Sequence, residues 1–250
     1  MKKPNDFKQQ FVDFINRHDL ITSGDHIGIA VSGGIDSMTL LDLFERARDE
    51  FRLKLCVLHF NHQLRDQAER DQTFVENACR QKNITFIIDS ADVAAFAKTQ
   101  NLSIEMAARE LRYAFFEKTA QKLSLNKIAT GHNASDQAET VLDHIVRGTG
   151  IGGLAGIPVK RDRYIRPLLF SERIDIEKYA EQESISFRID ASNVDQIFKR
   201  NRIRHSLLPL LQKEFNPQIT RSINRLSDHA SEANTIIENV VDEAFHNCAG

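Results

Sequence analysis

The chain has 250 residues, of which 41% are hydrophobic and 27% are charged, with a formal net charge of −2. This composition excludes a disordered, collagen-like or wholly coiled-coil chain, and the length favours one large α/β domain with a small appendage. The apolar runs are too short for a membrane span, and the N-terminal residues do not form a secretory signal.

The three cysteines are Cys56, Cys79 and Cys248, which lie far apart and form no C-x-x-C pair. This spacing argues against a disulfide framework, a zinc site or a cysteine-held iron–sulfur cluster. The pattern is typical of a protein of the reducing cytoplasm.

Charge is distributed unevenly along the chain. Residues 159–225 hold 14 Lys and Arg against 9 Asp and Glu, whereas residues 226–250 hold 5 acidic residues and no Lys or Arg. The small net charge therefore conceals a basic section that could meet a polyanion, although scattered surface charge would give the same count.

The first 150 residues alternate between short apolar runs and amphipathic segments. The pattern predicts strands at 26–31, 53–60, 84–89 and 127–131, and helices at 37–50, 67–82, 103–123 and 135–147. Such alternation predicts an α/β fold with a Rossmann-like, mostly parallel sheet that has helices on both faces.

A glycine-rich segment at 147–156 ends this alternation. Beyond it we expect a helix at 171–183, a short strand at 185–189 and, from residue 218, a long helix whose apolar side needs a partner. We therefore predict a main domain over residues 1–215, followed by a C-terminal helical extension over residues 216–250 that is a linker or the start of a further domain.

The strongest local signal is the loop that follows the first strand. It consists of Ser32, Gly33, Gly34, Ile35, Asp36 and Ser37. Two glycines allow a sharp turn and close approach of a ligand, and amide groups at the start of the next helix favour a phosphate. Asp36 fits such a loop if Mg²⁺ mediates, because carboxylate and phosphate repel each other. A plain strand–helix turn with a serine cap is the alternative; a Walker-type loop is excluded.

This S-G-G-x-D-S loop resembles the phosphate loop of N-type ATP pyrophosphatases, the PP-loop superfamily. Further stretches narrow the resemblance to the tRNA(Ile)-lysidine synthetase family over roughly residues 22–215. These stretches are His59–Arg65, Ser103–Tyr113, Thr130–Thr140, Arg147–Gly150, Asp190–Asn193 and Arg200–His205. The chain departs from the family at Asn133 and Ser135, where the relatives often carry a histidine and an acid.

The resemblance implies an ATP-dependent ligase that modifies a tRNA. The wobble cytidine (C34) of tRNA(Ile) with a CAU anticodon attacks the α-phosphate of ATP, and pyrophosphate leaves. The ε-amine of free L-lysine then displaces AMP at C2 to form lysidine. The relatives commonly carry C-terminal domains that help to hold tRNA, so the chain is either a fragment or a short form, and a homodimer is left open.

Roles follow for the residues near the carboxyl ends of the strands. Ser32, Gly33, Gly34, Asp36, Ser37 and His59 are predicted to bind ATP, with Asp36 as the Mg²⁺ ligand. His132 is a candidate base. Asp136 and Glu139 lie three residues apart on one helix, so their carboxylates share a face and could hold the lysine ammonium or Mg²⁺. Acids that complement a helix dipole are the alternative reading of this pair.

Basic residues supply the last group of candidates. Arg109 and Arg112 are predicted to position the adenylate or the RNA, although a solvated face with a Glu105–Arg109 pair is the alternative. Contacts with tRNA phosphates are predicted for Lys199, Arg200, Arg202 and Arg204, where the alternative is the start of a surface helix.

Three rival functions remain at this point. A tRNA 2-thiolation enzyme would need a sulfur relay or a cluster, and paired cysteines near the loops are missing. A small-molecule amidating synthetase has no need for the basic patch. A non-catalytic nucleotide sensor has no reason to keep Asp136 and Glu139 together.

Overall fold

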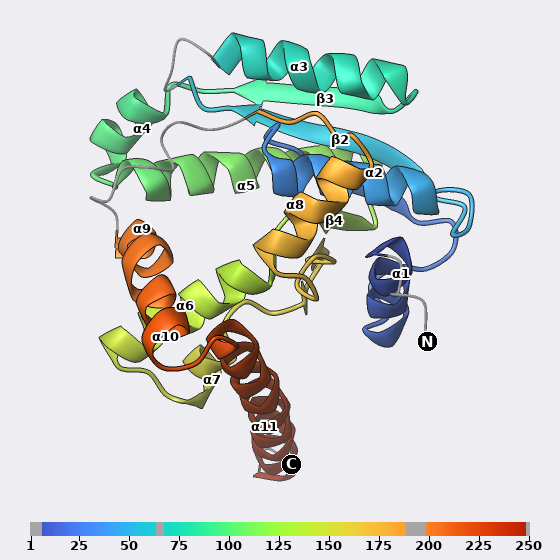
Figure 1. The fold of residues 1–250 in the computed structure, drawn as a ribbon. Coiled ribbons are helices and arrows are strands. Elements are labelled where there is room, and N and C mark those ends of the chain that lie inside the picture. Colours follow the sequence, from blue (N-terminus) through green and yellow to red (C-terminus); the bar gives the residue numbers. More distant parts are fainter. Residues whose placement is uncertain (1–6, 64–67, 189–198, 249–250) are drawn as a thin grey trace, which may run out of the picture. The chain divides into compact units, whose positions relative to one another are not determined.

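The computed structural model describes residues 7–63, 68–188 and 199–248 (Figure 1). Its centre is a six-stranded sheet with the order β3-β2-β1-β4-β6-β5. The strands are β1 (His26–Ala30), β2 (Lys54–Asn61), β3 (Thr85–Ser90), β4 (Lys127–Ala129), β5 (Lys160–Arg161) and β6 (Tyr164–Ile165). All neighbours pair in parallel except β5 and β6, which are antiparallel. The predicted mostly parallel sheet is confirmed.

Strand β2 is covered on both faces of the sheet because its residues 55–58 are all apolar and buried. Cys56 and Leu58 of β2 join Phe115 and Phe116 in one buried cluster. Successive side chains of a strand point to opposite faces. Leu55 and Val57, which flank Cys56, therefore project to the other face of the sheet, where both are buried. This two-sided burial places the strand ends, rather than a sheet face, within reach of a ligand.

Helices surround this sheet and form the first of two compact units. They are α1 (Phe7–Arg17), α2 (Ile35–Ala47), α3 (Ala68–Gln81), α4 (Val93–Gln100), α5 (Ile104–Leu123) and α8 (Arg173–Gln182), the last belonging to this unit from Ile174 onward. Helix α2 buries most of its surface, and Phe44 meets Phe11 of α1 edge-on at a centroid distance of 5.3 Å. Helix α2 is thereby fixed in place at its apolar side.

The second unit is helical. It contains α6 (Ala134–Arg147), α7 (Ile151–Leu154), α9 (Lys199–Arg202), the π-helical turn η2 (Ile203–Leu207), α10 (Leu208–Glu214) and α11 (Ile219–Cys248). Its core joins Ala138, Val141 and Leu142 of α6 to Ile203 and Ile223. Helix α6 is therefore held from two sides.

The structure differs from the sequence prediction at several places. Residues 185–188 form no strand; Ser184, at a φ of 53°, ends α8, and the amide of Arg188 bonds to the carbonyl of Gly33 instead of to a strand. Helix α2 starts at Ile35, two residues earlier than predicted. Helices α1 and α4 and the β5–β6 hairpin were not predicted. The domain boundary after residue 215 stays a prediction.

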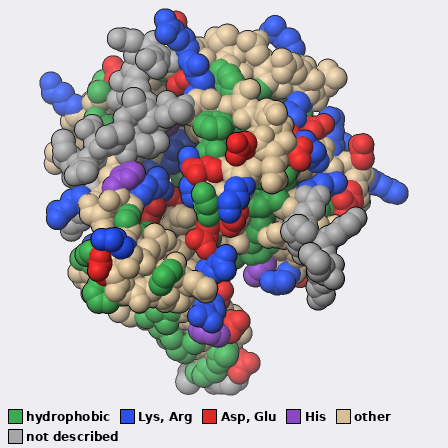
Figure 2. All heavy atoms as spheres, in the orientation of Figure 1, with side chains coloured by type: hydrophobic (Ala, Val, Ile, Leu, Met, Phe, Trp, Pro, Cys, Tyr) green, Lys and Arg blue, Asp and Glu red, His purple; other side chains and the backbone are tan. Residues whose placement is uncertain are grey.

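The long C-terminal helix was predicted from residue 218 and is present as α11. Its distal half exposes Ile236, Val240 and Phe245. Figure 2 shows hydrophobic side chains at the lower end of the view, where Figure 1 draws α11. In the described part of the chain, no helix combines the length and the apolar character needed to cross a bilayer.

The fold makes a prediction about Gly28 of β1. A Cβ atom at this position would lie 2.8 Å from the Cδ1 atoms of Leu58 and Leu125, so the strand needs a glycine where these side chains converge. We expect Gly28→Ala to lower the free energy of unfolding by about 1–3 kcal/mol through overpacking. Urea denaturation measures this change, and Gly150→Ala, where a Cβ would meet nothing within 4 Å, is the control. An unchanged midpoint for Gly28→Ala would contradict the packing argument.

Candidate active site

The strand order creates a switch point beside β1. The chain passes from β1 to β2 and β3 on one side and then crosses to β4 on the other side of β1. In open α/β sheets, ligands bind outside the carboxyl ends of the strands at such a point. The loops after β1 and β4 lie there, and a Cβ on Gly131 would come within 3.3 Å of the backbone of Asp36 and Ser37. Gly131 therefore allows the two loops to approach closely.

The loop after β1, residues 32–37, is called the phosphate loop below. Gly33 has a φ of 95°, a conformation that side-chain-bearing residues rarely adopt. Gly34 is the N-cap residue of α2, and no side chain caps the helix there. Asp36 stands in the first turn of α2. The loop thus ends in a helix N-terminus whose dipole favours an anion.

The two serines of the phosphate loop bond to its backbone. Ser37 Oγ donates to the Gly34 carbonyl at 2.8 Å and accepts from the amides of Ser32 and Gly33, each at 3.2 Å. Ser32 Oγ accepts from the Gly34 amide at 3.4 Å. The sequence led us to expect these amides to face a phosphate, whereas here the loop's own hydroxyls engage them. The bonds lie at the long end of the range for N–H···O, so a phosphate oxygen could replace them.

His59 contacts the backbone directly before the phosphate loop. Its side chain is only 4% exposed, and its Nδ1 lies 2.8 Å from the Val31 carbonyl at the end of β1. Burial lowers the pKa of His59, and the bond to Val31 and the charge of Asp71 oppose that shift. A neutral ring that donates a hydrogen bond to the Val31 carbonyl fits this environment, so His59 holds the backbone at the start of the phosphate loop. Its predicted contact with ATP stays a prediction.

Arginine side chains gather around Tyr113 on α5. The Arg109 guanidinium lies 4.8 Å from the centre of the Tyr113 ring. Burial lowers the pKa of Arg112, Tyr113 opposes that shift, and the nearby charge of Arg109 lowers it further.

Arg166, which sequence reasoning missed, follows β6 and is 3% exposed. Burial lowers its pKa, Tyr113 opposes the shift, and Arg161 and Arg109 add to it. The signal for Arg166 was its place after an apolar strand, but that strand has only two residues and is too short to detect. Positive charge therefore concentrates on this side of the first unit.

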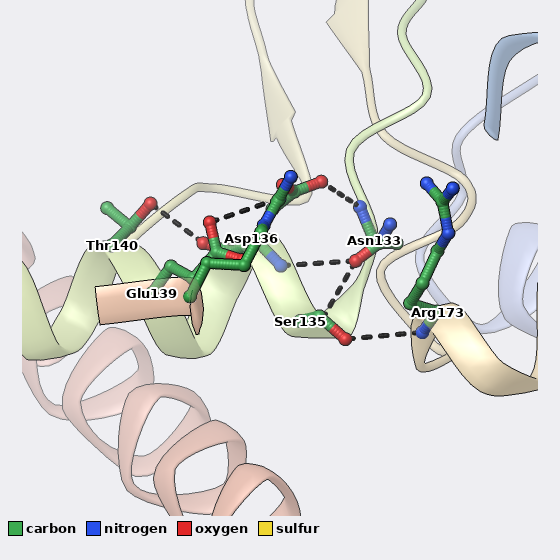
Figure 3. Close-up of polar contacts among 7 residues, drawn as sticks. Asn133, Ser135, Asp136, Glu139, Thr140 and Arg173 are labelled. Atoms are coloured by element: carbon green, nitrogen blue, oxygen red, sulfur yellow. Dashed lines mark hydrogen bonds and ion pairs between the residues drawn. The ribbon is translucent and has the colours of Figure 1, made fainter. Parts of the chain in front are cut away.

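The N-terminus of α6 is closed by a capping box, shown in Figure 3. The Asn133 side chain accepts from the amides of Ser135 and Asp136 at 2.9 and 3.1 Å, and Asp136 Oδ2 accepts from the Asn133 amide at 3.0 Å. Ser135 Oγ accepts from the Arg173 amide at 3.2 Å. Asn133 and Ser135 thus shape the start of this helix.

Asp136 and Glu139 share one face of α6, as their spacing predicts, and Arg204 joins them. Arg204 Nε lies 2.5 Å from Glu139 Oε1, and Nη2 lies 3.1 Å from Glu139 Oε2 and 2.8 Å from Asp136 Oδ1. Glu139 is 1% exposed, so its charge is compensated inside the protein. Arg204 was predicted to contact tRNA, a role that must now compete with this ion pair.

The predicted site residues divide between the two units. Asp36, His59, Arg109 and Arg112 belong to the first unit, and His132, Asp136, Glu139, Arg202 and Arg204 to the second. Arg202 is exposed. The side chains of Lys199 and Arg200 and the whole of the 190–193 motif lie outside the described residues.

Comparisons with known proteins show the family of the chain. Residues 4–211 match the PP-loop domain family, so the chain belongs to that family. Among curated relatives, the tRNA(Ile)-lysidine synthase of Clostridium tetani is 42% identical over 93% of this chain and 50% of its own length. The enzyme of the same name from Thermosipho africanus is 38% identical over 92% of this chain and 54% of its own length. The chain spans about half the length of the curated relatives it matches.

Solved structures share the fold at low sequence identity. The U34-tRNA thiolase NcsA from Methanococcus maripaludis superposes with a TM-score of 0.74 at 16% identity, covering 90% of this chain and 78% of that chain. The ammonia-dependent NAD synthetase of Campylobacter jejuni gives a TM-score of 0.52 at 17% identity, covering 91% and 92%. These likenesses concern the fold alone.

The Arg204 cluster makes a testable prediction about stability. Arg204→Ala leaves the buried Glu139 carboxylate without its guanidinium, so we expect the free energy of unfolding to fall by up to about 3 kcal/mol. Arg202→Ala, at an exposed position two residues away, should change it by less than about 0.5 kcal/mol. Chemical denaturation at pH 7 compares the two variants, and equal stability would show that the ion pair contributes nothing.

Proposed function

We propose that the chain carries the ATP-dependent ligase activity that joins L-lysine to C2 of the wobble cytidine of tRNA(Ile). The observation that carries the proposal is the similarity to relatives named tRNA(Ile)-lysidine synthase over 93% of the chain. The phosphate loop at the switch point and the carboxylate pair of α6 support the proposal, because the reaction needs one binding site for a triphosphate and another for an ammonium group.

In the first step, the C2 oxygen of the cytidine attacks the α-phosphate of ATP. An O–P bond forms, the bond to the β-phosphate breaks, and pyrophosphate leaves. The Ser32–Gly34 amides and the N-terminus of α2 would stabilise the negative charge on the phosphates. Arg109, Arg112 and Arg166 would attract the nucleotide or the RNA backbone.

Asp36 fits a magnesium ion. Mg²⁺ is held by one or two carboxylates together with phosphates and water, so the single acid of the phosphate loop suffices. In the described part of the chain, no group of three or more His, Cys, Asp or Glu side chains is arranged to hold a metal by itself. When bound with ATP, the ion would offset the charge of the triphosphate.

In the second step, the ε-amine of lysine attacks C2. A C–N bond forms, the C–O bond to the adenylate breaks, AMP leaves, and the amine loses its extra proton. Asp136 and Glu139 would receive the lysine ammonium in place of, or beside, Arg204. His132, directly before the N-cap of α6, would accept the proton. Lys199, Arg200 and Arg202 would contact tRNA phosphates. Because the proposed substrate is a tRNA, we propose the cytoplasm as the place of the reaction.

Cysteine chemistry weighs against the thiolation alternative. Cys56 and Cys79 are both buried, and burial raises the pKa of each thiol to about 12. The thiolate is the nucleophile in sulfur transfer, and neither side chain forms it readily at neutral pH. Although the fold resembles that of the U34-tRNA thiolase, Cys56 and Cys79 are therefore poorly suited to carry sulfur.

The direct test uses ATP, labelled lysine and a tRNA(Ile) transcript with a CAU anticodon. We expect labelled lysine on the wobble cytidine, detected by mass spectrometry of the nucleosides, and AMP in equal amount. A transcript with uridine at the wobble position is the control and should stay unlabelled. ATP turnover with ammonia and without RNA would instead select the amidating class, and no label on cytidine would overturn the proposal.

Two substitutions separate the proposed half-reactions. Asp36→Asn should reduce pyrophosphate release at least 100-fold, about 2.7 kcal/mol of transition-state stabilisation.

Glu139→Gln should chiefly raise the KM for lysine. Glu172→Gln, at a carboxylate that pairs with Arg221 instead, is the control and should change neither quantity. An unchanged lysine KM in Glu139→Gln would remove the lysine assignment.

A further inference from the structure

Two backbone carbonyls, that of Val31 directly before the phosphate loop and that of Gly33 within it, are held by residues outside the loop. The Val31 carbonyl lies 2.8 Å from His59 Nδ1, and the Gly33 carbonyl accepts a hydrogen bond of 2.9 Å from the Arg188 amide. In a trans peptide, the carbonyl of one residue and the amide of the next point in opposite directions. Holding these carbonyls therefore turns the amides of Ser32 and Gly34 toward the opposite side, where the loop hydroxyls engage them.

The Arg188 side chain ties its own segment to α3. Its Nε lies 3.2 Å from Asp71 Oδ1, and its guanidinium carbon lies 6.0 Å from the centre of the Phe74 ring. The hypothetical Cβ of Gly33 would meet Phe74 and the Arg188 Cγ, both at 3.8 Å. The side chain thus passes beside Gly33 and ends on α3, so the Arg188 amide is fixed at the Gly33 carbonyl by contacts made further along the same residue.

Asp71 connects the two outside supports. It pairs with Arg188, and its charge also acts on His59, whose pKa it raises against the effect of burial. The charge of one acid on α3 therefore acts on both groups that hold the Val31 and Gly33 carbonyls.

Global stability does not explain this arrangement. The side chains of Arg188 and Asp71 are 44% and 30% exposed, and ion pairs of that exposure contribute little to folding. The orientation of a backbone amide, in contrast, decides whether it can donate to a phosphate oxygen. A small contact can thus matter little for folding and much for anion binding.

We propose that Arg188, anchored by Asp71 and Phe74, is a positioning residue that orients the Gly33–Gly34 peptide for the triphosphate of ATP. The proposal rests on the assignment of the phosphate loop to ATP. Arg188 does not contact the nucleotide in this scheme; it acts through the Gly33 carbonyl. Loss of its side-chain anchor leaves the amide of residue 188 free to move away, and the Gly34 amide loses its fixed direction.

The experiment measures ATP binding and steady-state kinetics for Arg188→Ala, Arg188→Lys and Asp71→Asn. We expect Arg188→Ala and Asp71→Asn to raise the Kd and the KM for ATP about five- to tenfold, while the KM for lysine stays within twofold. Arg188→Lys keeps an ion pair with Asp71 and should recover most of the affinity. The double variant Arg188→Ala/Asp71→Asn should bind ATP no more weakly than either single variant, because the two substitutions remove the same anchor.

Arg80→Ala is the matched control. Arg80 pairs with Glu76 on the same helix α3, at exposures of 75% and 44%, and has no contact with the phosphate loop. Its Kd for ATP should equal that of the wild type. If Arg188→Ala is folded and its Kd for ATP stays within twofold of the wild type, or if the KM values for ATP and lysine rise together, the positioning role is wrong. A wild-type protein that does not bind ATP would overturn the proposed function as well.

Discussion

The direction of a few peptide groups at the carboxyl end of β1 is the constraint on which the proposed chemistry depends. Gly33 adopts a φ of 95°, and the carbonyls on either side of Ser32 are held by a buried histidine and by the Arg188 amide. Backbone amides that are oriented before a ligand arrives cost little reorganisation when the charge must be stabilised. The serine hydroxyls that bond these amides keep them satisfied in the free protein.

The acidic cluster of the second unit, Asp136 and Glu139 with Arg204, depends on the compensation of a buried charge. Glu139 is almost completely buried, and a buried carboxylate is tolerated only with a cation and hydrogen bonds around it. Arg204 supplies that cation through two nitrogens, and the capping box fixes Asp136 beside it. A lysine ammonium would bring the same charge to the same carboxylates, so the pair is suited to exchange one cation for another.

Positive charge in the first unit gathers around one tyrosine: the Arg109 guanidinium lies over the Tyr113 ring, and Tyr113 acts on the pKa of both Arg112 and Arg166. Like charges at close range are unfavourable unless an anion joins them. An adenylate or an RNA phosphate provides that anion in the proposed reaction. This charge distribution is compatible with the proposed anionic substrates.

The sequence by itself determined the parallel sheet, the phosphate loop after the first strand and the shared face of Asp136 and Glu139, because hydrophobic period, glycine placement and helical spacing are local properties. Only the tertiary structure decided that Arg204 reaches these acids from 65 and 68 residues away, that Arg166 is buried, and that Arg188 holds Gly33 instead of lying in a strand. Each of these depends on contacts between distant segments, and a side chain's partner across such a distance leaves no periodic trace in the chain.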